Sequence, residues 1–215
     1  MEHQASAGDE DRSDDFQIAM KANQAAFDVG QLAQDMVRGY AAHIAAIRVA
    51  PRLDGKAIVQ LIADYPSDFL QRKDGTKWLF DMQDALVSLA DKAVAAELPR
   101  VWLAGSLVRL GDALERNDYF NRAPELELVR HLRNGIAHGN RFEIREPEKL
   151  KKFPAHNRDG WFKHTIFEIT RALNGQCVLF DFMEAGDVLD LLSSVGLYLK
   201  QMGNGESPPR KSAHR

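Results

Sequence analysis

The sequence predicts a mainly α-helical protein, an up-and-down helical bundle with one β-hairpin inserted before the C-terminal helix. Three observations indicate this fold class. Apolar residues recur at three- and four-residue steps over most of the chain, which is the spacing of amphipathic helices. Prolines and capping residues stand where these periodic segments begin and end. Only about residues 161–183 change to strand-like runs, placed around an Asn-Gly pair.

The first half of the chain predicts three helices of different length. The first follows the capping pattern "SDD" and stops at Pro51, which cannot continue a helix. A shorter helix is expected over Lys56 to Asp64, with a further turn after Ser67. A longer helix is expected from about Thr76 to Leu98, closed by Pro99.

The second half predicts three more helices and the hairpin. A helix carries the apolar spacing from Trp102 to Leu114, and the next opens with Pro124 in its first turn and ends at Gly139. The hairpin turns at Asn174-Gly175, and the last helix covers about residues 185–202. The aromatic residues near the turn are expected in the hairpin core, with a base-stacking platform as the alternative: Trp161, Phe162, Phe167, Phe180 and Phe182.

Length and composition predict one domain over residues 15–202, between a disordered acidic N-terminus (1–14) and a disordered tail (203–215). The chain has 215 residues, of which 45% are hydrophobic, enough for a sizeable core. Cys177 is the single cysteine, so a disulfide framework is excluded and a reducing compartment is expected. The acidic start does not resemble a signal peptide, and no apolar run is long enough to span a bilayer. We therefore expect a cytoplasmic protein with no membrane partner.

Charge is unevenly distributed along the chain. Residues 1–15 hold six acidic residues against one arginine, whereas residues 141–164 hold seven Lys or Arg against four acidic residues. This basic segment is too weakly charged to coat nucleic acid, but it is sufficient for a local phosphate-facing surface. A solvated loop of mixed charge is the alternative interpretation.

The octet "RNGIAHGN", residues 133–140, ends the helix that Pro124 opens. At about 100° per residue, Arg130, His131 and His138 fall within about 60° of Asn134, on the side opposite the apolar residues. Arg133 lies on the flank, about 100° from Asn134. The helix therefore carries a polar strip that runs to its C-terminal end.

Each residue type in this strip has a chemical use. The negative end of the helix dipole favours a protonated imidazole at His138, a residue suited to proton transfer near neutral pH. The guanidinium of Arg133 is a planar donor for phosphate, and Asn134 lies one turn before His138, where its amide could orient either group. A capped amphipathic helix with ordinary surface ion pairs is the alternative, because the dipole alone favours histidine in a last turn.

The run "RNGIAH" resembles the Arg-x4-6-His signature of the HEPN superfamily, in which a polar residue commonly follows the arginine. Its place late in a helical bundle is also similar to that family. "RNGIAHGNRF" further resembles a branch associated with plasmids and mobile elements, although Asn140 stands where some toxin-type members have tyrosine. The similarity in architecture covers about residues 16–202, and the sequence similarity about ten residues.

The resemblance implies a metal-independent endoribonuclease that cleaves single-stranded RNA as a homodimer, with two motif helices meeting at one site. It assigns Arg133, Asn134 and His138 as catalytic residues, and we expect Arg130, His131 and Arg141 to contact RNA. Cleavage through the 2′-OH needs one group to remove a proton and another to protonate the leaving oxygen. One His138 per chain cannot conveniently do both, so a second copy would complete the site.

No metal and no cofactor are expected, because the sequence offers no thiolate pair or carboxylate cluster near these histidines. For a toxin-like role in phage defence or a plasmid conflict system, a neutralising or regulatory protein is a candidate further partner. Two alternatives remain open. One is a catalytically silent HEPN module that dimerises or binds RNA or nucleotides. The other is a helical interaction protein outside the family.

Overall fold

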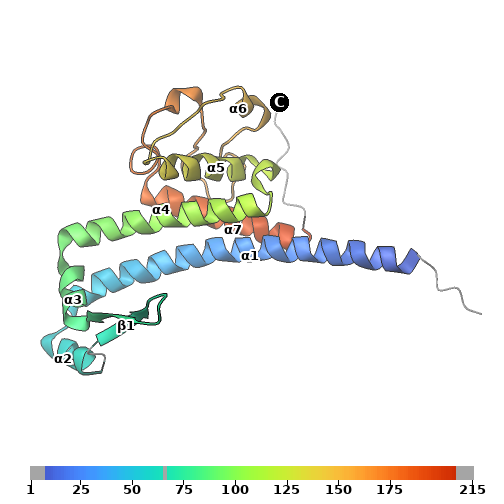
Figure 1. Cartoon of the computed structure of the whole chain (residues 1–215). Coiled ribbons are helices and arrows are strands. Elements are labelled where there is room, and N and C mark those ends of the chain that lie inside the picture. Colours follow the sequence, from blue (N-terminus) through green and yellow to red (C-terminus); the bar gives the residue numbers. More distant parts are fainter. Residues whose placement is uncertain (1–7, 65–66, 207–215) are drawn as a thin grey trace, which may run out of the picture. The chain divides into compact units, whose positions relative to one another are not determined.

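The described residues of the protein are mainly α-helical. The computed structural model describes residues 8–64 and 67–206, without the side chains of residues 8–23, 51, 67–69 and 80. In this part of the chain there are seven α-helices and one two-stranded antiparallel hairpin (Figure 1). Residues 1–7 and 207–215, which belong to the ends predicted to be disordered, lie outside the described residues.

The chain divides into two compact units. The first comprises residues 1–37 and 104–215, and the second comprises residues 38–103. Helices α1 (Gly8–Val49) and α4 (Lys92–Arg116) each contribute residues to both units. The octet lies in the first unit.

The first unit is built on parts of α1 and α4 together with α5 (Pro124–Ala137) and α7 (Ala185–Gly203). α1 begins earlier than the "SDD" pattern predicts, at Gly8, and ends before Pro51 as predicted. The prediction that Pro124 opens a helix is confirmed, because the ring of proline is tolerated in the first turn. The apolar faces of these helices form the core, which includes Ala33, Leu107, Leu110, Leu114, Leu128, Leu132, Leu191, Leu192, Val195 and Leu199.

The predicted hairpin at residues 161–183 is wrong. Between α5 and α7 the described chain is irregular, with a short α6 (Lys149–Lys152), a 3-10 turn (Arg171–Leu173) and three isolated β-bridges. The tight turn does form, since Gly175 has a φ of 83°. The two predicted strands, however, do not pair with each other.

Each half of the predicted hairpin pairs with a different neighbour. On one side, Asn157 donates its backbone N–H to the carbonyl of Phe167 at 3.2 Å. On the other side, Phe142 donates to the carbonyl of Gln176 at 2.9 Å, and Asn174 accepts from the backbone of Ile144 through its side chain at 2.8 Å. The segment after α5 thus satisfies the backbone groups that a hairpin would have used.

Some aromatic residues of this segment therefore pack against one another, whereas others are exposed. Phe142 and Phe182 meet edge to face with ring centroids 5.0 Å apart, and Phe167 and Phe182 at 5.2 Å. Trp161 and Phe162 remain 51% and 42% exposed. A common hairpin core for these residues does not exist.

The hairpin of the structure lies in the second unit, where a helical turn was expected. Strands β1 (Ser67–Gln71) and β2 (Lys77–Asp81) pair antiparallel with Ser67 opposite Asp81. The Asp74-Gly75 pair makes the turn: Gly75 has a φ of 84°, and the carboxylate of Asp74 accepts from the backbone of Thr76 at 2.9 Å. Asp-Gly between short apolar runs is the sequence pattern of a hairpin.

The single long helix predicted from Thr76 to Leu98 is also wrong. β2 is followed by α3 (Met82–Ala90), and α4 then begins at Lys92. The carboxylates of Asp81 and Asp91 start these two helices by accepting backbone hydrogen bonds at 2.7 Å from Gln83 and Ala93. Pro99 lies inside α4 and does not end it. In the same unit, α2 (Gly55–Asp64) confirms the predicted short helix.

Two buried contacts fix α5 in the first unit. At its start, Ser194 of α7 accepts the backbone N–H groups of Trp161 and Phe162 at 2.6 and 3.2 Å and donates its own hydrogen to the buried Glu125. Near its end, the backbone of Gly135 lies directly against Val178. These contacts determine which face of α5 is buried.

We predict that Gly135→Ala destabilises the protein. A Cβ at this position would lie 2.4 Å from Cγ2 of Val178, so the overpacking cost of about 1–3 kcal/mol should exceed the gain of up to about 1 kcal/mol in helix propensity. Urea unfolding measures the difference. Gly105→Ala in α4 is the matched control, since a Cβ there meets nothing within 4 Å and should stabilise by about 0.5–1 kcal/mol. An equal gain in both variants would contradict the close contact.

We predict that Glu125→Gln stabilises the protein increasingly as the pH rises. Burial raises the pKa of Glu125 to about 7 from its ordinary 4.5, so the fold favours the protonated form. The stability that this group contributes is complete below pH 4.5 and is lost as the pH rises through 7. The stability of Glu125→Gln relative to wild type should grow by up to about 3 kcal/mol across this range. Urea unfolding at several pH values tests this, with the exposed Glu115→Gln as control, and a pH-independent difference would exclude it.

Candidate functional site

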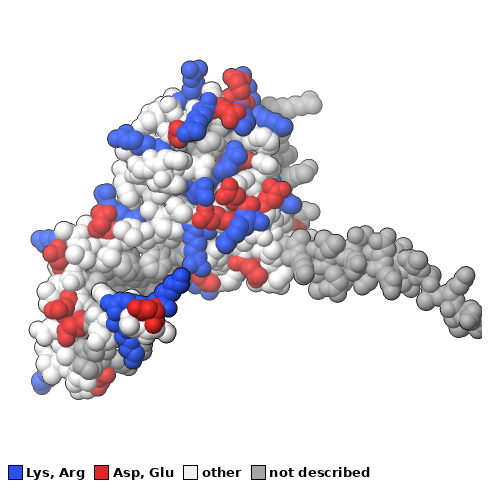
Figure 2. All heavy atoms as spheres, in the orientation of Figure 1, with Lys and Arg blue, Asp and Glu red and all other residues white. Residues whose placement is uncertain are grey.

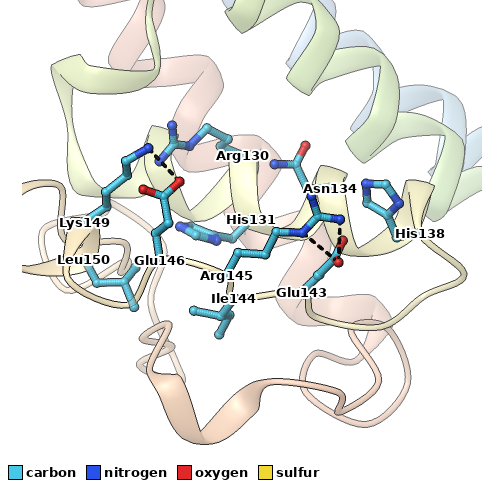
Figure 3. A pocket seen from close by; sticks show the side chains of 10 residues that line it. All are labelled: Arg130, His131, Asn134, His138, Glu143, Ile144, Arg145, Glu146, Lys149 and Leu150. Carbon is cyan, nitrogen blue, oxygen red and sulfur yellow. Dashed lines mark hydrogen bonds and ion pairs between the residues drawn. The ribbon is translucent and has the colours of Figure 1, made fainter.

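The C-terminal half of α5 forms one wall of an open groove of about 260 Å³ (Figure 3). Four of the residues singled out in the sequence line this wall: Arg130, His131, Asn134 and His138. They share a wall because the opposite face of the helix is buried through residues such as Leu128 and Leu132. The structure therefore brings these four side chains together.

The second wall comes from the segment that follows α5 and from α6. It carries ion pairs between neighbouring side chains, Glu143 with Arg145 at 2.6 Å and Glu146 with Lys149 at 2.9 Å. Both pairs are exposed and therefore weak. Figure 2 shows Lys and Arg interspersed with Asp and Glu on the face drawn, without one uniformly basic patch.

His138 lies where α5 ends, and its side chain is exposed. Its backbone N–H still donates to the carbonyl of Asn134 at 3.0 Å, whereas Gly139 has a φ of 83° and leaves the helix. The predicted function of Gly139 as the helix stop is confirmed. The backbone of His138 is consequently held by the last turn of the helix, and its imidazole ring is accessible to solvent.

Asn140 connects the end of α5 to the chain before α7, a function that the sequence analysis missed. Its side chain donates to the carbonyl of Leu179 at 3.1 Å and accepts the backbone N–H of the same residue at 2.9 Å. Its own carbonyl accepts from the backbone of Val178 at 3.0 Å. The Gly-Asn pair after the helix is a sequence pattern that indicates such a connection, because asparagine tolerates the left-handed backbone conformation that Asn140 adopts at a φ of 60°.

Arg133 and Arg141 do not line the groove. Arg133 extends to α4, where its guanidinium binds Asp112 at 2.6 Å and Glu115 at 3.4 Å. Arg141 donates to the carbonyl of Gly175 at 2.8 Å. Sequence spacing could not indicate these partners, because they come from distant parts of the chain.

Burial shifts the pKa of two ionisable residues of α5 that neighbour Arg130, Glu127 and His131. Glu127 is only 2% exposed and forms an ion pair with Arg130 at 2.8 Å, and its burial raises the pKa of its carboxyl group. Burial and the nearby Arg130 lower the pKa of His131 to about 4. Its Nε2 is buried and has no hydrogen-bond partner among the described residues. His131 is therefore neutral at pH 7.

Comparison with known proteins adds no assignment: no family model, no curated protein and no solved structure matches the chain. Among the described residues, no cluster of three or more His, Cys, Asp or Glu could hold a metal ion. Within the same part of the chain, no helix has the length and apolar character needed to cross a membrane. The assignment of function thus depends on the groove and the motif.

We predict that His131 remains neutral over most of the acidic range. Its buried ring should take up a proton only near pH 4, because solvation of the imidazolium is lost and Arg130 repels the charge. The 15N shifts of the histidine rings, assigned with His131→Gln, measure this midpoint. A midpoint above 6 would show that the ring is solvated and not held as the structure has it.

Proposed function

We propose that this chain is a metal-independent endoribonuclease of the HEPN type, which cleaves single-stranded RNA at a site formed by two copies of the chain. The observation that carries the proposal is the shared groove wall of Asn134 and the exposed His138, within the Arg133-Asn134-x3-His138 motif. Arg130, His131 and the second wall of the groove supply candidate contacts to the RNA backbone. A cytoplasmic role in phage defence or a plasmid conflict system is part of the same proposal.

The chemistry requires two proton-transfer groups. A base removes the proton from the 2′-OH, the 2′ oxygen attacks the neighbouring phosphorus, and an acid protonates the leaving 5′ oxygen. The products are a 2′,3′-cyclic phosphate end and a 5′-OH end. His131 is unsuited to be the second group, because its low pKa makes it a poor base and leaves no imidazolium form to act as an acid at pH 7. The His138 of a second copy is the group that fits, since a twofold axis beside the groove would supply it.

The competing function is a catalytically silent HEPN module. It is favoured by one observation, that the guanidinium of Arg133 is held by Asp112 and Glu115 and does not line the groove. A silent module would dimerise or bind RNA through the same face without cleaving it. Cleavage assays separate the two functions.

We predict that the purified chain cleaves a single-stranded RNA in the presence of EDTA and leaves 2′,3′-cyclic phosphate ends. His138→Ala should reduce the rate at least about a hundredfold, the usual contribution of a general acid or base. His164→Ala should not, because this histidine is 87% exposed, outside the groove and 4.0 Å from Asp190. Retained cleavage in His138→Ala would refute the assignment, and an inert wild type that binds RNA would establish the silent module.

The composite site has its own test. Inactive His138→Ala is added to a fixed amount of wild type under conditions of subunit exchange, and the cleavage rate is followed together with the mass in solution. A site that needs two His138 side chains should lose activity as mixed dimers form. Activity that is unaffected by the mixed dimers would place the whole site in one chain.

A further inference from the structure

Most of the N–H hydrogens of the Arg133 guanidinium donate to other side chains of the same chain. An arginine side chain has five N–H hydrogens and no acceptor. Nε and Nη2 donate to the same carboxylate oxygen of Asp112 at 2.9 and 2.6 Å, and Nη2 also reaches Glu115 at 3.4 Å. Nη1 donates to Oδ1 of Asn134 at 3.0 Å. One N–H hydrogen remains, so Arg133 cannot donate a bidentate pair of hydrogen bonds to a phosphate.

α4 is shaped to hold this side chain. A Cβ at Gly111 would lie 2.6 Å from Cγ of Arg133, so the aliphatic part of the arginine crosses α4 where a glycine leaves room for it. Asp112 follows directly, and Glu115 lies one helical turn further along the same face. Two carboxylates around one guanidinium leave a net negative charge there, which disfavours a phosphate.

The same contacts fix the amide of Asn134. Because a guanidinium only donates, the atom of Asn134 that it touches must be the oxygen, and the NH₂ group is on the other arm of the amide. Asn134 lines the groove, and Figure 3 shows its amide between Arg130 and His138. In the described part of the chain, no hydrogen bond from Nδ2 is found. The two N–H donors of this amide are therefore oriented, and no group among the described residues accepts from them.

We propose that Asp112, acting through Arg133, orients the amide of Asn134 so that Nδ2, and not the guanidinium, donates to the scissile phosphate. Asp112 and Arg133 are then positioning residues, and Asn134 is the residue that touches the substrate. This inference rests on the endoribonuclease proposed above for the choice of ligand. The orientation of the amide is independent of that choice.

Kinetics of four variants test the proposal. Asn134→Ala should lower kcat about a hundredfold with a smaller change in KM, because the donor acts on charge that develops in the transition state. Asp112→Asn should lower kcat about 10- to 100-fold through misplacement of the amide. Glu115→Gln, which removes the longer and more exposed contact, should have a smaller effect. Arg133→Lys should behave as Asp112→Asn, since a lysine keeps the charge but cannot span Asp112 and Asn134.

The decisive measurement is the double variant. If Asp112 acts through Asn134, then Asp112→Asn should cost little more once Asn134 is already alanine. Fully multiplicative losses would overturn the proposal. So would an Asp112→Asn variant that is more active than wild type, since Asp112 would then restrain Arg133 from binding phosphate.

A spectroscopic test distinguishes failure of this inference from failure of the proposed function. The side-chain NH₂ resonances of Asn134, assigned with Asn134→Ala, should shift on Asp112→Asn and less on Glu115→Gln. If the shift is seen in a chain that does not cleave RNA, the proposed function fails and the oriented amide stands. If the chain cleaves RNA but the resonances do not respond to Asp112→Asn, the positioning by Asp112 is refuted alone.

Discussion

The rotation of α5 about its own axis is the constraint on which the rest of the site depends. Leu128, Leu132 and their neighbours are fully buried, so the helix cannot turn without exposing apolar surface. The contact of Glu125 holds the start of α5, and the contact of Gly135 holds the helix near its end. A rotation of one residue position, about 100°, would move Asn134 out of the groove. Burial on one face therefore determines the chemistry available on the other.

The charges around the groove are partly neutralised within the protein. Arg130, Arg145 and Lys149 all have carboxylate partners, and the pairs of Arg145 and Lys149 are on the surface. Exposed pairs of this kind are worth little and can be exchanged for other anions. The pair of Arg130 differs, because Glu127 is buried and would remain without a counter-charge if the arginine left. The cations on the second wall are thus more readily available to a ligand than Arg130.

Much of the first unit could be predicted from the sequence because its helices are long and strongly periodic. Pro124, Gly139 and the start of α7 at Ala185 were predicted correctly, as each depends on local backbone chemistry. The hairpin was misplaced for a different reason. Asn174-Gly175 does form a turn, but the segments on its two sides pair with residues 141–144 and 155–157, and no local pattern identifies these partners. The Asp74-Gly75 hairpin does have a local pattern, which competes with the helical spacing of the apolar residues around it.

The candidate site, like the fold, could be predicted only where it depends on local helical geometry. Helical geometry placed Asn134 and His138 on one strip, since the angle between positions follows from the helix alone. It could not show that Arg133 would be held by Asp112, 21 positions earlier in the chain, or that Asn140 would bind the backbone at Leu179. Side chains on the flank of a helix choose among neighbours that only the tertiary structure supplies. Long, flexible arginines are the hardest to place for this reason.

The contact between Gly135 and Val178 has a consequence for how this sequence can vary. The two positions are 43 residues apart, yet together they fill one space between α5 and the chain that leads to α7. A larger side chain at 135 is compatible only with a smaller one at 178. Chains that share this arrangement should therefore exchange these two residues in concert, and such paired variation would appear beside the motif without either residue touching a ligand.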